Sequence, residues 1–350
     1  MDSLLPETKE RISCKYADIL KGPFQVAFDI TNKCNFRCLH CYNNSGENHL
    51  IDKELNDNEA ICFAKDIRDL KLQNFCFCGG EPLLRFDLMC KMTKILSSAT
   101  SKISVVSNAS LFSREKAEKL ESCGLKYVQF SLDGGTAQSY MKLRPHEGAF
   151  EKVLKSIVIA KHSGIDVSVS FIPTKYNVNE LDDIVHMLIE QGVKALRLQP
   201  LMKMGRAKEN ISTIIPSKFQ YRELIRFIYE LQNKHRGQID IQWGDPVDHL
   251  IRFRTRNQHL VTSAIVLSDG SIAVSPYLPF VVGNVRKHPF SAYWDAGLAK
   301  VWELPFIQTY AKEILSVDNM ENSQIWGEVS SDTCFGYDLI EDSFFPQEGR

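Results

Sequence analysis

The sequence predicts an α/β fold: a partial (β/α)6 barrel followed by a small α+β segment. Three observations support this class. A unit of amphipathic helix, glycine and short strand recurs; the strands alternate apolar and polar residues; and the strand–helix alternation stops near residue 205. Alternating strands and helices indicate a parallel sheet or barrel, because each helix provides the crossover between two parallel strands.

The helix–glycine–strand unit is clearest in the middle of the chain. Gly124, Gly164 and Gly192 each follow an amphipathic stretch, where a left-handed cap ends a helix. The strands predicted after them cover 128–133, 167–171 and 195–199. Earlier strands are expected at 25–30, 74–78 and 102–106, with helices near 57–70, 86–98 and 113–123.

Two of the predicted helices have apolar stripes at helical spacing. The first stripe is Phe150, Val153, Leu154, Ile157 and Val158, and the second is Leu181, Ile184, Val185 and Leu188. We expect both stripes to pack on the sheet.

Several strands alternate apolar and polar residues, whereas strands buried on both faces are usually apolar throughout. Val128, Phe130 and Leu132 alternate with Gln129 and Ser131, and the strands at 167–171 and 195–199 show the same pattern. If the apolar set faces the helices, the barrel has a polar lumen suited to a charged cofactor. The alternative is that this face of the sheet meets solvent.

After residue 205 the pattern changes. A helix is predicted near 217–234, then a hairpin over 264–276 with Asp269-Gly270 as its turn. A short segment at 283–285 and a helix around 292–304 follow. We therefore expect a core domain at 20–205, an extension at 206–318 and an acidic tail at 319–350.

Composition is compatible with a cytoplasmic enzyme. The 350 residues are 44% hydrophobic with a net charge of -1, and no basic stripe indicates a nucleic-acid partner. No apolar stretch is long enough to span a bilayer, so membrane insertion is not expected. Nine of the ten cysteines lie at or before Cys123, which favours metal or redox chemistry over disulfides.

Three cysteines close together are the main chemical signal. Cys34, Cys38 and Cys41 form a C-x3-C-x2-C run, and Gly79-Gly80-Glu81-Pro82 follows on the next predicted strand. Three thiolates can hold three irons of a cubane cluster and leave the fourth iron open to another molecule. A zinc site completed by Cys76 and Cys78 is one alternative, and a disulfide framework is another.

The two motifs together resemble the signature of radical S-adenosylmethionine (radical SAM) enzymes. The resemblance covers Cys34–Tyr42 and Gly79–Leu84, in the same order and with a helix-sized gap. It implies one 4Fe–4S cluster whose open iron is chelated by SAM. An electron from the cluster then cleaves SAM to methionine and a 5′-deoxyadenosyl radical that abstracts hydrogen from a substrate.

The resemblance also implies SAM contacts near these motifs. Backbone at His40 would meet the adenine, and Gly79 and Gly80 would let backbone approach the methionine part, because neither has a Cβ. Glu81 would accept a hydrogen bond from the SAM ammonium, with Pro82 fixing the turn.

Further contacts are implied downstream. Ser107-Asn108 resembles a Thr-Asn-Gly motif and departs from it at Ala109, and a plain turn is the alternative. Ser131 and Asp133 match a Ser-x-Asp-Gly motif near the ribose and the carboxylate of SAM. One more expected contact is Arg144, which would pair with the SAM carboxylate; a surface ion pair is the alternative.

The second half resembles the SPASM or twitch extension of peptide-modifying radical SAM enzymes. In that family a cysteine usually follows the hairpin, where this sequence has Ser275-Pro276. The single cysteine left there, Cys334, is too few for an auxiliary cluster. We therefore expect one cluster only.

Three functions follow as hypotheses. The first is a maturase that cross-links or epimerises a ribosomally made peptide, served by a reducing partner such as flavodoxin or ferredoxin. The second is a radical SAM enzyme acting on a small cofactor precursor such as a tetrapyrrole, and the third is an iron–sulfur or zinc protein with a binding role only. Without an auxiliary cluster, Cys334 is a candidate hydrogen-atom donor, with Cys78 competing and a structural role as the alternative. We expect no separate leader-binding domain before the first strand.

Overall fold

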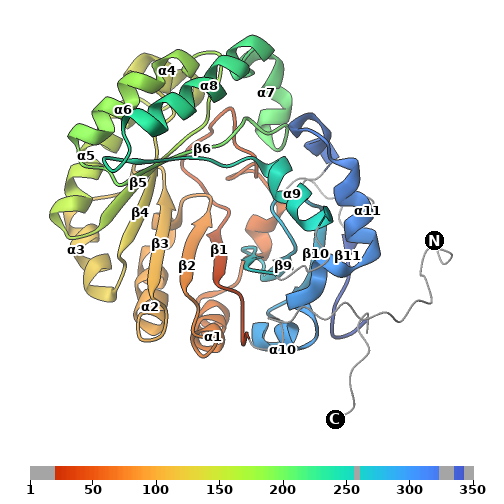
Figure 1. Ribbon diagram of the computed structural model, residues 1–350. Coiled ribbons are helices and arrows are strands. Elements are labelled where there is room, and N and C mark those ends of the chain that lie inside the picture. Colours follow the sequence, from red (N-terminus) through yellow and green to blue (C-terminus); the bar gives the residue numbers. More distant parts are fainter. Residues whose placement is uncertain (1–19, 256–260, 323–334, 343–350) are drawn as a thin grey trace.

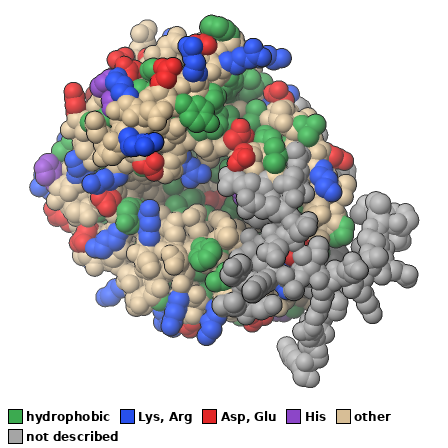
Figure 2. Space-filling model, viewed as in Figure 1, with side chains coloured by type: hydrophobic (Ala, Val, Ile, Leu, Met, Phe, Trp, Pro, Cys, Tyr) green, Lys and Arg blue, Asp and Glu red, His purple; other side chains and the backbone are tan. Residues whose placement is uncertain are grey.

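A computed structural model describes residues 20–255, 261–322 and 335–342. Its strands form one 11-stranded sheet in the order β11-β10-β9-β8-β1-β2-β3-β4-β5-β6-β7. Figure 1 shows the sheet curving around an open interior, with helices along its outer side. In the space-filling view from the same side, the surface is hollowed near the middle of the barrel (Figure 2). The fold is therefore the partial α/β barrel with a smaller extension that the sequence predicts.

Seven parallel strands make up the barrel part of the sheet. They are β1 (Gln25–Thr31), β2 (Asn74–Gly79), β3 (Lys102–Ser107), β4 (Tyr127–Ser131), β5 (Asp166–Phe171), β6 (Ala195–Leu198) and β7 (Asp240–Trp243). The first six agree with the predicted strands to within one or two residues at most ends. The seventh is an addition: β7 pairs with β6 beyond residue 205, and its four residues are too few to show a clear period.

Helices connect these strands and cover the outer face of the sheet (Figure 1). They are α1 (Asp57–Arg68), α2 (Phe86–Leu96), α3 (Arg114–Cys123), α4 (Ala137–Leu143), α5 (Ala149–His162), α6 (Leu181–Glu190), α7 (Arg206–Ile214) and α8 (Lys218–Lys234). Short 3-10 turns lie at η1 (His49–Lys53), η2 (Pro82–Arg85) and η3 (Val178–Glu180). Helices α4 and α7 were not predicted, and both are short.

The ends of these helices have local causes. Asn56 and Glu59 form a capping box at the start of α1. After α3, α5 and α6 the chain enters the left-handed region at Gly124, Gly164 and Gly192, with φ of +109°, +76° and +63°. These are the glycine positions that the sequence marks as helix ends, so this prediction is confirmed.

The hydrophobic core lies between the sheet and the outer helices. Phe130 and Phe171 on the strands are fully buried, and Phe28 of β1 packs edge-on against Phe63 of α1 at 5.3 Å between ring centroids. The stripe of α6 is buried as predicted. In the α5 stripe, Val158 is a wrong prediction: it is 44% exposed, because the buried ladder runs through 150, 153, 157 and 160 and Val158 lies beside it.

The extension joins the sheet on the other side of β1. Strand β8 (Ser263–Val266) pairs in parallel with β1 and in antiparallel with β9 (Ser271–Ala273). The turn between β8 and β9 contains Asp269 and Gly270, as predicted, and Gly270 has φ of +89°. The remaining elements are α9 (Pro246–Thr255), β10 (Phe280–Asn284), α10 (Phe290–Asp295), η4 (Leu298–Glu303), α11 (Pro305–Glu313), η5 (Val317–Asn322) and β11 (Phe335–Gly336).

Among the described helices, none has both the length and the apolar character needed to cross a membrane.

Candidate active site

The three cysteines of the motif lie in the loop that follows β1, at the carboxyl end of the sheet. Cys38 is buried, and Cys34 and Cys41 are half-buried. Backbone N–H groups donate to two of the sulfurs: Phe36 to Cys34 Sγ at 3.4 Å, and Ser45 to Cys41 Sγ at 3.4 Å. Donors already directed at sulfur are what thiolate ligands of a metal cluster require.

The electrostatics of the loop fit a bound cationic cluster. Burial and a neighbouring thiol raise the pKa of Cys34, and burial together with the neighbouring thiols raises the pKa of Cys38 to about 12, while Arg144 opposes both shifts. The three thiols are therefore close enough to repel one another as thiolates. The iron ions of a cluster bound at this point would offset that repulsion. The residues present therefore fit an iron–sulfur cluster.

Gly79 and Gly80 pack against the backbone where the cysteine loop begins. A Cβ on Gly79 would lie 2.1 Å from the Thr31 carbonyl oxygen, and one on Gly80 would lie 2.1 Å from the Lys33 carbonyl oxygen. The Gly80 N–H donates to Thr31 O at 2.7 Å, and the Glu81 N–H donates to Lys33 O at 2.9 Å. Glycine is thus required at both positions by the protein's own packing, because the backbone there lies directly against the start of the cysteine loop.

Glu81 is fully buried and binds the turn after β3. Its carboxylate accepts hydrogen bonds from Ser107 Oγ at 2.9 Å and from the Asn108 N–H at 2.8 Å. Asn108 Nδ2 in turn reaches Cys34 Sγ at 3.9 Å. Burial raises the pKa of Glu81, and these neutral donors oppose the shift. Three residues predicted from separate motifs, together with Pro82 buried at the start of η2, therefore meet on this side of the loop.

Asp133 is the centre of a second, charged group. It accepts Arg144 Nε at 2.6 Å on Oδ2 and the Ile172 N–H at 2.8 Å on Oδ1, and His40 Nε2 lies 3.0 Å from Oδ2. Although burial opposes ionisation, Arg144 and His40 hold the pKa of Asp133 well below its usual range. Arg144 Nη1 also donates to Cys38 Sγ at 3.3 Å. The surface ion pair considered for Arg144 is therefore wrong, since the arginine is buried in this group.

Ser131 lies at the end of β4, half-buried on the inner face of the sheet, with the Ser170 hydroxyl 3.5 Å away. Cys334, predicted as a hydrogen-atom donor, lies outside the described residues. Its competitor Cys78 lies on β2, where its thiol donates to Cys76 Sγ at 3.4 Å. That bond lowers the pKa of Cys76 and, together with burial, raises the pKa of Cys78 well above its usual value. Cys78 is the member of the pair that keeps its hydrogen.

Two residues at the start of α7, which the sequence motifs did not indicate, hold the cysteine loop. Arg206 donates to Cys38 O at 3.1 Å, Ser45 O at 3.1 Å and Glu47 Oε2 at 2.7 Å. A Cβ on Gly205, which has φ of +54°, would lie 2.4 Å from Cys41 O. The only sequence signal was a Gly-Arg pair a few residues after the last predicted strand, which by itself does not indicate a contact with the cysteine loop.

Three thiols, a glycine pair and two buried carboxylates lie together at one end of the strands of an open parallel barrel. This arrangement is typical of an enzyme that holds a metal cluster. Residues 28–188 match the family model for the radical SAM superfamily. Residues 28–188 are therefore a radical SAM domain, and enzymes with this domain use a 4Fe–4S cluster and SAM.

Relatives and solved structures agree with this assignment. The chain is 24% identical to an AdoMet-dependent heme synthase of Methanosarcina barkeri over 78% of this chain and 82% of that protein. It is 25% identical to a PqqA peptide cyclase of Bradyrhizobium diazoefficiens over 66% of this chain and 60% of that protein. The structure of Streptococcus suis SuiB bound to S-adenosylmethionine is similar with a TM-score of 0.65 and 14% identity, covering 93% of this chain and 79% of SuiB.

Proposed function

We propose that this enzyme modifies a ribosomally made peptide by removing a hydrogen atom from an unactivated carbon, with cross-linking or epimerisation as the outcome. The observation that carries the radical chemistry is the loop in which Cys34, Cys38 and Cys41 lie together beside Arg144 and the Gly79–Glu81 segment. When bound, a 4Fe–4S cluster with SAM at its open iron supplies the 5′-deoxyadenosyl radical.

The residues of the chain have distinct tasks in this proposal. Cys34, Cys38 and Cys41 ligate the cluster, and the Arg144 guanidinium beside Cys38 favours its thiolate form. Gly79 and Gly80 seat the cysteine loop, and the Glu81 carboxylate orders Asn108 next to Cys34. Around this frame we place SAM against His40, Gly79, Gly80, Glu81, Pro82, Ser107, Asn108, Ser131, Asp133 and Arg144.

The charged group constrains how SAM would be held. Asp133 and Arg144 bond to each other through Arg144 Nε, so this nitrogen is already occupied when SAM binds. The Arg144 side chain still presents donors beyond its Nε, and these face Cys38 and His40. A SAM carboxylate would therefore be received by a guanidinium that is already positioned by Asp133, which lowers the entropy lost on binding.

Similarity to a peptide cyclase supports a peptide substrate, and similarity to a heme synthase supports the small-molecule alternative. The heme synthase relative aligns with 78% of this chain, and a PqqA peptide cyclase of Rhizobium meliloti aligns with the same share. A tetrapyrrole or similar cofactor precursor is therefore the second candidate. Product analysis by mass spectrometry separates them: a modified peptide supports the first, and turnover of a tetrapyrrole precursor with no change in any peptide supports the second.

The cluster assignment has a direct test. Anaerobically reconstituted enzyme should bind about four irons per chain, and a count near eight would contradict a single cubane. Replacing Cys34, Cys38 or Cys41 by Ala should abolish release of 5′-deoxyadenosine from SAM. The matched control is Cys62→Ala, an exposed thiol on α1, which should keep both iron and SAM cleavage.

We further propose that a thiol completes an epimerisation by giving a hydrogen atom to the substrate carbon radical. The C–H bond forms as the S–H bond breaks. The thiyl radical left behind then takes an electron from the reducing partner, a flavodoxin or a ferredoxin, and a proton from water. Cys334 and Cys78 are the two candidate donors. Cys78→Ser or Cys334→Ser should leave SAM cleavage intact and stop deuterium incorporation from deuterated water at carbon. If both variants still incorporate deuterium at carbon, neither thiol is the hydrogen-atom donor.

A further inference from the structure

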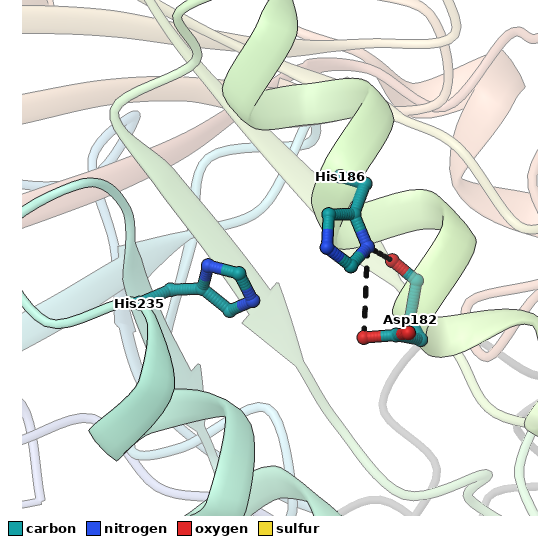
Figure 3. Close-up of side chains that lie close together, drawn as sticks. All are labelled: Asp182, His186 and His235. Carbon is teal, nitrogen blue, oxygen red and sulfur yellow. Dashed lines mark hydrogen bonds and ion pairs between the residues drawn. The ribbon is translucent and has the colours of Figure 1, made fainter.

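Three metal-ligating side chains meet on the outer helical layer, away from the cysteine loop. Asp182 and His186 lie one turn apart on α6, and His235 follows the last residue of α8. One ligand atom from each lies within 4.8 Å of the others. Figure 3 shows the two imidazoles and the carboxylate around a common space between the two helices.

His235 is the most informative member of the group. It is only 5% exposed, yet neither of its ring nitrogens has a hydrogen-bond partner in the described part of the chain. Its backbone is held on both sides, since its N–H donates to Leu231 O at 2.9 Å and its carbonyl accepts the Gln238 N–H at 2.9 Å. The ring lies edge-on to His186, 5.2 Å away between centroids and at 89°. Buried polar groups normally have a partner, so this ring points to one that is not a protein atom.

His186 is already oriented as a ligand. Its Nδ1 lies 2.9 Å from the Asp182 carbonyl oxygen, so Nδ1–H donates there. An imidazole that donates from Nδ1 to a carbonyl keeps its lone pair on Nε2, which is the usual arrangement of a metal-binding histidine. Spacing by four residues on one helix places His186 and the Asp182 carboxylate on the same face.

The Asp182 carboxylate also has a competing partner. Lys234 Nζ lies 3.4 Å from Asp182 Oδ1, with both side chains about half exposed. An exposed pair of this kind contributes little to stability, and the lysine can swing into solvent. It therefore does not prevent the carboxylate from turning towards a cation.

We propose that Asp182, His186 and His235 bind a zinc ion or a similar divalent transition metal, with water in the fourth position. Two imidazoles and one carboxylate suit such ions, whereas Mg²⁺ and Ca²⁺ prefer oxygen ligands. The ion would tie α6 to the end of α8, and so fasten the helix that leads into β7. This site lies outside the proposed reaction and does not depend on it.

Zinc binding to the holoenzyme is the test. The reconstituted enzyme is equilibrated with zinc chloride and dialysed, and zinc and iron per chain are measured together with the zinc X-ray absorption spectrum. We expect one zinc with nitrogen and oxygen ligands at about 2.0–2.1 Å. Sulfur at about 2.3 Å would place the zinc on cysteines and overturn the proposal, as would no retained zinc.

Variants and thermal unfolding locate the ion. Zinc at a hundredfold excess over its dissociation constant should raise Tm by about 5 °C, and magnesium should not. Asp182→Asn, His186→Gln and His235→Gln should each remove the shift, and His162→Gln, an exposed histidine on α5, should keep it. Asp182 and His186 are half exposed, so their variants decide the matter even if His235→Gln fails to fold. An unchanged shift in those two variants would refute the site.

Discussion

Two buried carboxylates support the cysteine loop from different elements and by different chemistry. Glu81, after β2, is surrounded by neutral donors, and through Asn108 it reaches Cys34. Asp133, after β4, is bound by a cation, and through Arg144 it reaches Cys38. Their pKa values accordingly move in opposite directions, raised for Glu81 and lowered for Asp133. Burial alone does not set the charge of a carboxyl group here; its partners do.

The largest expected effect is at the charged group. Asp133→Asn leaves the Arg144 guanidinium buried without its counter-ion, and breaking such a pair costs about 3–5 kcal/mol. The free energy of unfolding in urea, measured on metal-free protein, should fall by that amount. Asp69→Asn is the control, because Asp69 pairs with Arg68 at the surface and its loss should change nothing measurable. An equal effect of both changes would show that the Asp133–Arg144 pair contributes no more to stability than a surface ion pair.

The neutral group should respond less. Glu81→Gln keeps the shape but turns one acceptor oxygen into an amino group, which faces either the Ser107 hydroxyl or the Asn108 N–H. One buried donor is then left unpaired, at a cost of about 1–3 kcal/mol. The same urea measurement checks this. A cost above that of Asp133→Asn would reverse the comparison.

The two carboxylates should also have opposite pH dependence. The folded-state pKa of Asp133 is below its unfolded value, so its contribution to stability is present above about pH 4 and is lost as pH falls further. The folded-state pKa of Glu81 is above its unfolded value, so the folded state binds more protons and gains stability as pH falls towards about 4.

Urea unfolding from pH 7 down to about 3 measures both slopes. The stability difference between wild type and Asp133→Asn should shrink at the acid end, whereas that between wild type and Glu81→Gln should widen. A tenfold change in the proton affinity of a carboxylate on folding corresponds to about 1.4 kcal/mol of stability. Parallel curves for the two variants would contradict the assigned pKa directions.

The smallest effect concerns the turn that Glu81 binds. Ala109 has φ of +67°, a left-handed conformation that is costly for any residue with a Cβ. Ala109→Gly should relieve this strain but also removes a fully buried methyl group, so we expect the free energy of unfolding to rise by less than about 1 kcal/mol. A matched change is Ala117→Gly, within α3, which also removes a fully buried methyl group and should destabilise the protein by about 1–2 kcal/mol. Destabilisation at both positions would show that the turn is not strained.

The periodic part of the fold could be predicted from the sequence. Apolar alternation and glycine caps carry local information, and they identified the first six strands and most of the outer helices. The pairing of β8 with β1 could not be predicted in this way, because a parallel contact between Gln25 and Ser263 has no local signature. The same holds for β7, whose four residues are too few to establish a period.

The sequence motifs indicated individual residues of the candidate site but not the bonds between them. The motifs named Glu81, Asp133 and Arg144 as separate SAM contacts, and the structure shows two of them bonded to each other. Arg206 was missed because a single arginine after a strand does not indicate where its side chain folds back. Only the distances show that it binds Cys38 O and Ser45 O.

The contacts that shape the cysteine loop are distant in sequence, which has a consequence for the order of folding. Arg206 reaches Cys38 across 168 residues, and Asn32 at the base of the loop donates to Ser268 across 236 residues. Contacts of such separation form late, after the intervening chain is available. During synthesis the three thiols therefore emerge long before the residues that hold them in place. We expect a ribosome-bound chain that ends before β8 to bind iron poorly, so that cluster insertion follows completion of the extension.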